Sequence, residues 1–194
     1  MRKITHFLIT LLLTSCATFD QTNILPHQRV NGLGFSFAVP TEKPWFAVEY
    51  GTSHRIKLSQ LNNQDSYSIL VSLNRPPYQG MYQSAKAHLK SIQIQQYRKQ
   101  AKPGYIQHTR NAWIESKYGD LCISYTTEGE DWHGRNNEGP ALVYLIGLSC
   151  PHPSLSNVLI TIDLSRRAET SADDVDLVAY AEALFSSFEY TTLD

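Results

Sequence analysis

The sequence predicts an α+β domain in which two main helices cover a mostly antiparallel sheet. Apolar residues alternate with polar ones in several short runs and then follow helical spacing once. The same succession repeats in the second half, which gives the order strands, helix, strands, helix. Clusters of proline, glycine and asparagine separate these runs. The 194-residue chain is long enough for one domain with its own core.

The first half of the chain is expected to form an antiparallel meander followed by a helix. Phe35, Phe37 and Val39 alternate on one face of a strand at residues 33–40. Further strands are expected at residues 45–50, 54–61 and 67–73. Residues 79–100 have apolar side chains at helical spacing and are followed by a proline–glycine pair, so they form the first helix.

The second half of the chain repeats this order. Strands are expected at residues 108–117, 121–127, 141–150 and 157–165. The first two are joined by a tight turn at residues 118–120. A capping box at residues 171–174 places acids in the first turn of a second helix, which runs to about Phe188.

The N-terminus has the features of a cleaved export signal. Arg2 and Lys3 form a positive region, and residues 4–13 form an apolar run that is too short to span a bilayer, which takes about 20 residues. The segment that follows, Leu13-Thr14-Ser15-Cys16, resembles the bacterial lipobox. This resemblance implies cleavage after Ser15, a thioether-linked diacylglycerol on Cys16 and acylation of the new N-terminus.

The lipobox resemblance sets the expected organisation of the chain. It implies a lipoprotein signal peptide at residues 1–15, a lipidated N-terminus and tether at residues 16–32, and a single periplasmic α+β domain at residues 33–194. Each buried methylene contributes ~0.8 kcal/mol, so several acyl chains on Cys16 would hold the protein stably on a membrane. In lipoproteins an aspartate after the lipidated cysteine often retains the protein in the inner membrane. Ala17 stands there, so we expect the periplasmic side of the outer membrane rather than the inner membrane.

Cys122 and Cys150 are the two cysteines that remain when Cys16 is lipidated. An even count in an oxidising compartment predicts a disulfide between them, which would stabilise the fold by roughly 3–4 kcal/mol. The two cysteines lie in facing strands of a hairpin, but the centre of the polar connection gives a register that misses this pairing by a few residues. A bulge or a lopsided loop would close the gap, and two buried thiols are the alternative.

Two short segments resemble PsbP-like domains. Residues 34–40 read Gly-Phe-Ser-Phe-Ala-Val-Pro with a tryptophan soon after, and residues 183–190 read Ala-Leu-Phe-Ser-Ser-Phe-Glu-Tyr. The first segment is similar to an N-terminal strand of that fold, and the second is similar to the end of its last helix. The resemblance implies a PsbP-like α/β sandwich, and such domains are mostly non-catalytic binding or assembly modules.

The polar connection at residues 128–139 is the first candidate site. It is long for a hairpin connection, where about 2–5 residues are usual. Its tryptophan has no apolar neighbours in the sequence. The loop therefore either packs back onto the domain, or binds a partner, or uses its acids and histidine for a cation or a proton transfer. The candidate binding residues are Glu130, Asp131, Trp132, His133 and Arg135.

A basic face on the first helix is the second candidate site. Residues 66–114 contain seven basic residues and no acid, whereas residues 115–194 contain fourteen acids and four basic residues. Such a face binds lipid phosphates or an acidic partner. The alternatives are a solvated surface and neutralisation of the acidic C-terminal helix within the domain. The candidate residues are Lys86, Lys90, Arg98 and Lys99.

The sequence contains no motif that indicates catalysis or metal binding. Its histidines lack the spacings HxH, HxxxH and HExxH, and Ser149 lacks the second glycine and the strand-to-helix turn of a nucleophile elbow. We expect no cofactor, no metal and no nucleic-acid partner. The predicted function is a membrane-anchored envelope lipoprotein that binds or assembles an envelope protein. The alternatives are an envelope hydrolase that uses residues 128–139 and an immunity-type lipoprotein that binds a toxin.

The lipobox resemblance generates a direct test. In the variant Cys16→Ser the thioether cannot form, so the protein should remain as unprocessed precursor and should not incorporate labelled fatty acid. Metabolic labelling followed by electrophoresis of the envelope fraction measures both properties. Labelling and processing that match the unsubstituted protein would contradict the lipidation of Cys16.

Overall fold

The structure is a computed structural model of the 194-residue chain. It describes residues 23–40, 44–49, 55–61, 65–75, 82–99, 104–132, 139–155, 157–168 and 175–192. The predicted signal peptide, the lipobox with Cys16 and the capping box at residues 171–174 lie outside the described residues.

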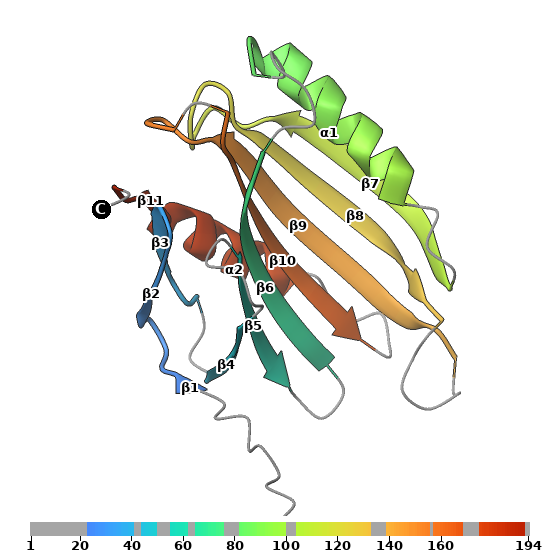
Figure 1. The fold of residues 1–194 in the computed structure, drawn as a ribbon. Coiled ribbons are helices and arrows are strands. Elements are labelled where there is room, and N and C mark those ends of the chain that lie inside the picture. Colours follow the sequence, from blue (N-terminus) through green and yellow to red (C-terminus); the bar gives the residue numbers. More distant parts are fainter. Residues whose placement is uncertain are drawn as a thin grey trace, which may run out of the picture.

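The described chain folds in the order strands, helix, strands, helix, with a short strand at the end (Figure 1). The first half contains β1 (Asn23–Ile24), β2 (Arg29–Gly32), β3 (Phe35–Ala38), β4 (Trp45–Glu49), β5 (Arg55–Leu61), β6 (Asp65–Asn74) and α1 (Ala85–Lys99). The second half contains β7 (Tyr105–Ile114), β8 (Ile123–Asp131), β9 (Ala141–Pro151), β10 (Leu159–Ala168), α2 (Val175–Ser187) and β11 (Glu189–Tyr190).

One large sheet organises the domain. Its eight strands lie in the order β1-β4-β5-β6-β10-β9-β8-β7, and neighbouring strands pair antiparallel. β6 pairs with β10 along its whole length, so the meanders from the two halves of the chain meet in the middle of the sheet. The predicted α+β class, with two main helices on a mostly antiparallel sheet, is confirmed.

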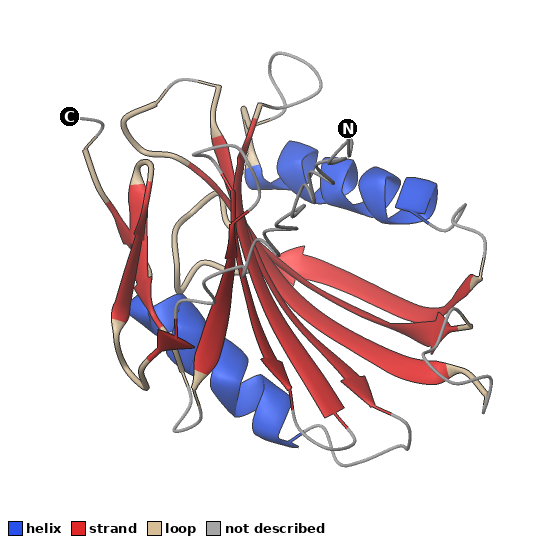
Figure 2. Ribbon diagram, turned by 60° about the horizontal axis from the view of Figure 1, so that its bottom comes forward, coloured by secondary structure: helices blue, strands red, loops and turns tan. Residues whose placement is uncertain are grey.

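The two helices lie on opposite faces of this sheet and cover different strands (Figure 2). α2 packs against β10, β9 and β3, where its Leu177 joins Ile162 and Leu164 in the main core. α1 packs against β7 and β8, where Ile92 contacts a smaller cluster around Ile123. Successive strand residues point to opposite faces, so one sheet supplies apolar side chains to both cores.

The sequence predicted that the folded domain starts at residue 33, but its first strands lie before that residue. β3 pairs with β2 on one side and with β11 on the other, which gives a small three-stranded sheet. β1 pairs with β4 at one end of the large sheet. Residues 23–32, which the sequence assigned to the tether, therefore lie partly in strands. Their backbone groups are satisfied by pairing with later strands, and this pairing does not require an apolar periodicity in the segment itself.

The predicted disulfide between Cys122 and Cys150 is present, with their Cα atoms 4.4 Å apart. In the β8–β9 hairpin Ile123 lies opposite Ser149 and Asp131 lies opposite Ala141, and the same register sets the two cysteines face to face. The sequence predicted a β8–β9 register that misses this cysteine pairing by a few residues. The observed register differs because β8 continues to Asp131, which shortens the connection and moves its centre. The first four residues of the predicted loop at residues 128–139 are therefore strand, since they pair with both β7 and β9.

Local hydrogen bonds explain two further boundaries that differ from the predictions. β7 ends at Ile114 rather than at residue 117, because a wider turn follows in which Glu115 N–H donates to the Cys122 carbonyl, and Cys122 N–H to the Gly119 carbonyl. α1 begins at Ala85 rather than at residue 79. The Ser84 hydroxyl accepts a hydrogen bond from Ala87 N–H at 3.2 Å, so Ser84 acts as the N-cap of this helix.

A glycine in β9 lets a tyrosine side chain from β8 extend over β9 and reach β10 on the same face of the sheet. Tyr125, Gly147 and Asp163 lie side by side on β8, β9 and β10. The Tyr125 ring lies over Gly147, and its hydroxyl donates to Asp163 Oδ1 at 2.5 Å. Burial, and after it the nearby Asp163 carboxylate, raises the pKa of Tyr125 well above its ordinary value, so the phenol keeps its proton and remains a donor.

Gly147→Ala should therefore destabilise the domain. The added Cβ would lie 2.2 Å from Cζ of Tyr125, so the ring must leave its place and the Asp163 hydrogen bond must lengthen or break. We expect a loss of about 2 kcal/mol in the free energy of unfolding, measured by denaturant titration. In a Tyr125→Ala background the same substitution should cost much less, because the clashing ring is gone. An equal cost in both backgrounds would contradict this account.

Candidate functional site

The last two strands of the sheet, β7 and β8, carry exposed side chains on the side that α2 occupies elsewhere. α2 packs against β10, β9 and β3 and does not extend across β7 and β8 (Figures 1 and 2). Strand alternation directs one set of side chains to this open side. We call it the Trp113–Trp132 face. Ser124, opposite Trp113, is buried on it, and its other residues are Ile106, Thr109, Asn111, Trp113, Glu115, Thr126, Glu128, Glu130 and Trp132.

Three large apolar side chains on this face are open to solvent. Trp132 is 55% exposed, Ile106 is 49% exposed and Trp113 is 41% exposed. Single exposed apolar residues are common on protein surfaces; Ile106 and Trp132 lie together at one end of the β7–β8 pair and Trp113 lies near the other, which makes both ends candidates for contact with a partner. Two of the three are tryptophans, the residue type most enriched among the side chains that dominate binding energy at protein interfaces.

Each tryptophan is held by a glutamate on the same face. Trp113 Nε1 donates to Glu115 Oε2 at 3.2 Å, and Trp132 Nε1 donates to Glu130 Oε2 at 3.1 Å. The Trp132 backbone is fixed as well, because its N–H donates to the Gly104 carbonyl at 2.7 Å. The indole N–H groups are thus satisfied inside the domain while the rings stay open, which leaves their apolar surface available for contact.

The Trp113–Trp132 face is acidic. Glu128 and Glu130 lie on it in β8, and Glu115 follows the end of β7. Among the described residues β7 and β8 contribute neither lysine nor arginine to this side, and Lys117 lies in the turn after Glu115, where its backbone N–H donates to Glu115 Oε1. His108, at a register shift between Gln107 and Thr109, places Nε2 3.1 Å from Glu130 Oε1. Acidic groups among exposed aromatic rings provide both charge and ring faces for a cationic partner.

The structure separates the residues that were predicted to form one binding loop. Glu130 and Trp132 meet on the Trp113–Trp132 face. Asp131 points to the other face, where its carboxylate pairs with Arg167 at 3.3 Å. His133 and Arg135 lie outside the described residues. Trp132 is 55% exposed, so its side chain is not part of the core, and the choice among a packed-back loop, a binding loop and a catalytic or cation-binding loop stays a prediction.

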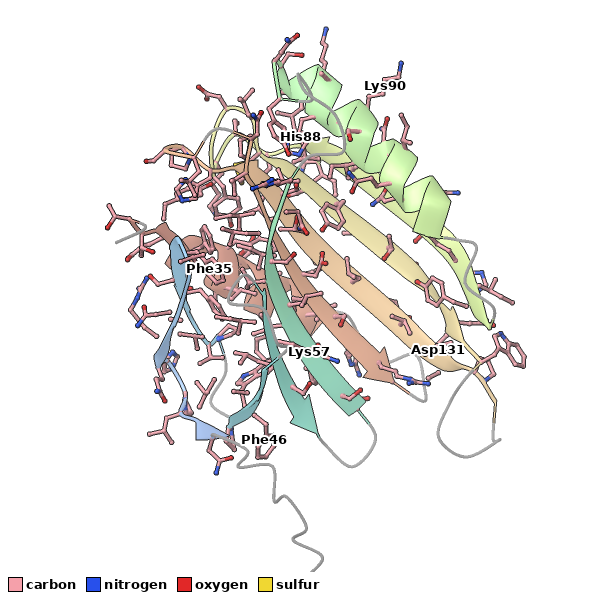
Figure 3. All side chains as sticks on the ribbon, viewed as in Figure 1. Phe35, Phe46, Lys57, His88, Lys90 and Asp131 are labelled. Carbon is pink, nitrogen blue, oxygen red and sulfur yellow. A yellow bond between two sulfur atoms is a disulfide. The ribbon has the colours of Figure 1, made fainter. Side chains whose placement is uncertain are left out.

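The predicted basic face lies on α1, away from the Trp113–Trp132 face. Lys86 and Lys90 are exposed, and Figure 3 shows Lys90 directed away from the sheet while His88 lies beneath the helix. Arg98 and Lys99 belong to the last turn of α1. The choice between a solvated surface and a lipid-binding surface therefore stays a prediction.

The structure also joins a serine and a histidine that the sequence left unconnected. His88 Nε2 lies 3.1 Å from Ser149 Oγ, and His88 Nδ1 lies 2.6 Å from the Leu121 carbonyl oxygen. The carbonyl only accepts, so Nδ1 carries the proton and Nε2 accepts from the serine hydroxyl. Both side chains are fully buried, so the His88 contacts attach α1 to β9 and to the turn before β8 rather than presenting a nucleophile. Nothing in the sequence signals it, because the two residues are 61 positions apart.

The described residues contain no group of three or more histidine, cysteine, aspartate or glutamate side chains that could hold a metal ion. Within the same part of the chain, no helix has the length and apolar character needed to cross a membrane.

Comparisons with known proteins give a structural likeness alone. No protein-family model and no curated protein matches the chain. The chain is similar to cyanobacterial PsbP (CyanoP) from Synechocystis sp. PCC 6803, with 21% identity, a TM-score of 0.44, and coverage of 92% of this chain and 99% of the other. It is also similar to LpqN of Mycobacterium tuberculosis, described as involved in cell envelope biogenesis, with 11% identity, a TM-score of 0.45, and coverage of 89% and 92%. Both TM-scores are below 0.5, so the fold class rests on the strands and helices of this chain.

The buried His88 should make stability depend on pH. Burial lowers the pKa of His88 below its ordinary value of 6.5, and the hydrogen bond to Leu121 offsets this only in part. Below pH 6.5 the unfolded chain therefore binds a proton that the folded chain does not bind. Stability should fall as the pH drops from 6.5 toward the folded pKa, by at most about 1.4 kcal/mol per pH unit from this group.

Denaturant titrations of two histidine variants test this expectation. At pH 7.5 His88→Gln should be less stable than the unsubstituted protein, because glutamine does not reproduce the packing of the imidazole beneath α1. Between pH 6.5 and 5 the variant should lose less stability than the unsubstituted protein, because it lacks the titrating group. The control His27→Asn replaces an exposed histidine whose φ of 60° asparagine tolerates. This control should keep the full pH dependence. Identical pH dependences in His88→Gln and the unsubstituted protein would refute the assignment.

Proposed function

We propose that this chain is a lipid-anchored envelope protein whose domain acts as a non-catalytic binding or assembly module. The observation that carries the proposal is the Trp113–Trp132 face, which combines two exposed indole rings with three carboxylates. The partner would be another envelope protein, and the anchor would be lipid on Cys16, on the periplasmic side of the outer membrane. The LTSC segment supports the anchor.

The chemistry of the Trp113–Trp132 face supports contact with a protein. A tryptophan covered by a partner removes a large apolar area from water, and interface tryptophans often contribute about 2 kcal/mol or more. Here the indole N–H groups already have acceptors, so a partner that covers the rings leaves no buried donor unsatisfied. The fixed backbone of Trp132 also lowers the entropy lost on binding.

The positions of the acids favour binding over hydrolysis. Glu130 is bonded to Trp132 and His108, and Glu115 is bonded to Trp113, so both carboxylates hold neighbouring side chains. Asp131, which a hydrolase built on residues 128–139 would need nearby, faces the other side of the sheet. An immunity-type lipoprotein would use the same acidic and aromatic face and would differ from an assembly module in its partner.

The start of β1 supports a domain that stays close to the membrane. Only residues 17–22 separate the predicted lipid-bearing Cys16 from Asn23, the first residue of β1. Seven residue steps span at most about 25 Å when fully extended. This is about half the reach of a tether that extends to residue 32, so the β1 end of the domain would lie near the membrane surface.

Photo-crosslinking in intact cells tests the proposed face. A photoreactive amino acid is placed at position 113, at position 132, or at position 178 as the control. Val178 is 49% exposed but lies on α2. Discrete adducts with an envelope protein are expected from positions 113 and 132 and not from position 178. The same adducts from position 178, or none from the other two, would contradict the proposed face.

Trp132→Ala measures the contribution of one anchor. Its ring is not packed in the core, so the variant should retain its melting temperature within a few degrees. The yield of the adduct formed from position 113 should fall strongly, consistent with a loss of about 2 kcal/mol in binding. A lower melting temperature combined with unchanged adduct yield would show that Trp132 stabilises the fold instead.

A further inference from the structure

We infer that the partner adds a strand to the outer edge of β7 and that the added segment is basic and extended. This inference rests on the proposed function, because it names the partner chemistry for the Trp113–Trp132 face. It follows from three properties of β7: its place in the sheet, the side chains along it and the charge beside it.

β7 is the last strand at one edge of the large sheet. Its inner edge pairs with β8, and no described strand pairs with its outer edge. Such an edge presents backbone N–H and C=O groups that can pair with an added strand. The opposite end of the sheet is different, because the last strand there, β1, has only two residues. β7 has ten.

The edge of β7 carries little protection against pairing. Natural edge strands are commonly blunted by proline, by lysine, by a bulge or by being short. The single irregularity of β7 lies between Gln107 and Thr109, near its start. From Thr109 to Ile114 the pairing with β8 is regular, and this stretch contains neither proline nor lysine; its one charged residue, Arg110, lies on the α1 side. Six regular residues give about 20 Å of edge, enough for a short added strand.

The side chains beside this edge favour arginine or lysine on the added strand. Alternate residues of that strand would lie on the Trp113–Trp132 face. One of them would stack on the indole of Trp113 and approach Glu115. Another would extend over the short side chain of Thr109 toward Glu128, which lies opposite Thr109 on β8. Backbone pairing would supply affinity, and these two contacts would select for positive charge.

Charge also argues against a second copy of this chain as the added strand. A symmetric antiparallel β7–β7 pair would place the two Trp113–Trp132 faces on the same side of one continuous sheet. Each copy would bring Glu115, Glu128 and Glu130 to that surface, and the contacts available to each would be acidic rather than basic. A basic segment of a different protein avoids this repulsion.

A set of three peptides tests the inference on the purified full-length protein in detergent micelles. The probe is a seven-residue peptide, acetylated and amidated, that alternates arginine with valine. The second peptide replaces each arginine with glutamate. The third keeps the arginines but carries methyl groups on its backbone amides, which removes the donors needed for strand pairing. None contains tryptophan, so the intrinsic tryptophan fluorescence of the protein reports binding.

The arginine peptide is expected to bind, and the other two should bind at least tenfold more weakly. Hydrogen exchange of β7 amides should slow when the arginine peptide is added. Glu128→Gln should weaken its binding about fivefold at low salt, the effect of one partly exposed ion pair. The matched control Glu182→Gln, at an exposed position of α2, should not change it.

Three results would overturn the inference. They are equal binding of all three peptides, absence of binding by the arginine peptide, and protection of β7 through concentration-dependent dimers without any peptide. The third result would identify a second copy as the occupant. If the crosslinks from positions 113 and 132 form while the arginine peptide fails to bind, the proposed function stands and strand addition is refuted.

Discussion

The last residues of β9 hold the separate parts of the domain together. Ser149 Oγ lies 3.1 Å from Nε2 of His88 on α1, and Cys150 forms the disulfide with Cys122 beside β8. His152 Nε2 lies 3.1 Å from the Gly34 carbonyl oxygen, which links the end of β9 to the small sheet. One helix, one hairpin partner and the second sheet are thus attached within four consecutive residues, the last three of β9 and His152 directly after it. Each attachment depends on the β8–β9 register, because a slip by one residue would turn Ser149 and Cys150 to the wrong faces.

This fixed end explains why each helix covers only part of a face. α1 is attached through His88 over β7 and β8, whereas α2 packs on the other face against β9, β10 and β3. The α1 side of β6 and β10 carries mostly polar residues, including Ser66, Ser68 and Asp163, and needs no helix above it. The α2 side of β7 and β8 instead carries tryptophans. Of these two parts of the sheet that no helix covers, the Trp113–Trp132 face is the unusual one, because it carries tryptophans rather than mostly polar residues.

Local sequence patterns predicted the elements well, and long-range pairing decided the rest. Alternating apolar residues indicated the central strands, and the cysteine count indicated the disulfide. Residues 128–131 were predicted as loop because glycine and acids disfavour strands, yet pairing on both sides keeps them in β8. Trp132 stood out among polar neighbours, whereas Trp113 was missed because it lies in a pattern typical of a core strand. Its exposure depends on where α2 ends, which no local signal encodes.

Strand alternation also converts a charge pattern along the chain into a charge pattern in space. The sequence separates an acid-free segment, which includes β7, from an acid-rich segment, which begins after it. Pairing of β7 with β8 brings the two segments into contact, as where His108 Nε2 lies 3.1 Å from Glu130 Oε1. The pleat then sorts the remaining charges, since Arg110 lies on the α1 side while Glu128 lies on the Trp113–Trp132 face. The basic helix and the acidic aromatic face therefore lie on opposite sides of one edge strand. A strand added at this edge would meet basic groups on the α1 side and acidic groups on the Trp113–Trp132 face. This difference would favour the orientation in which the added strand's own basic side chains lie on the Trp113–Trp132 face.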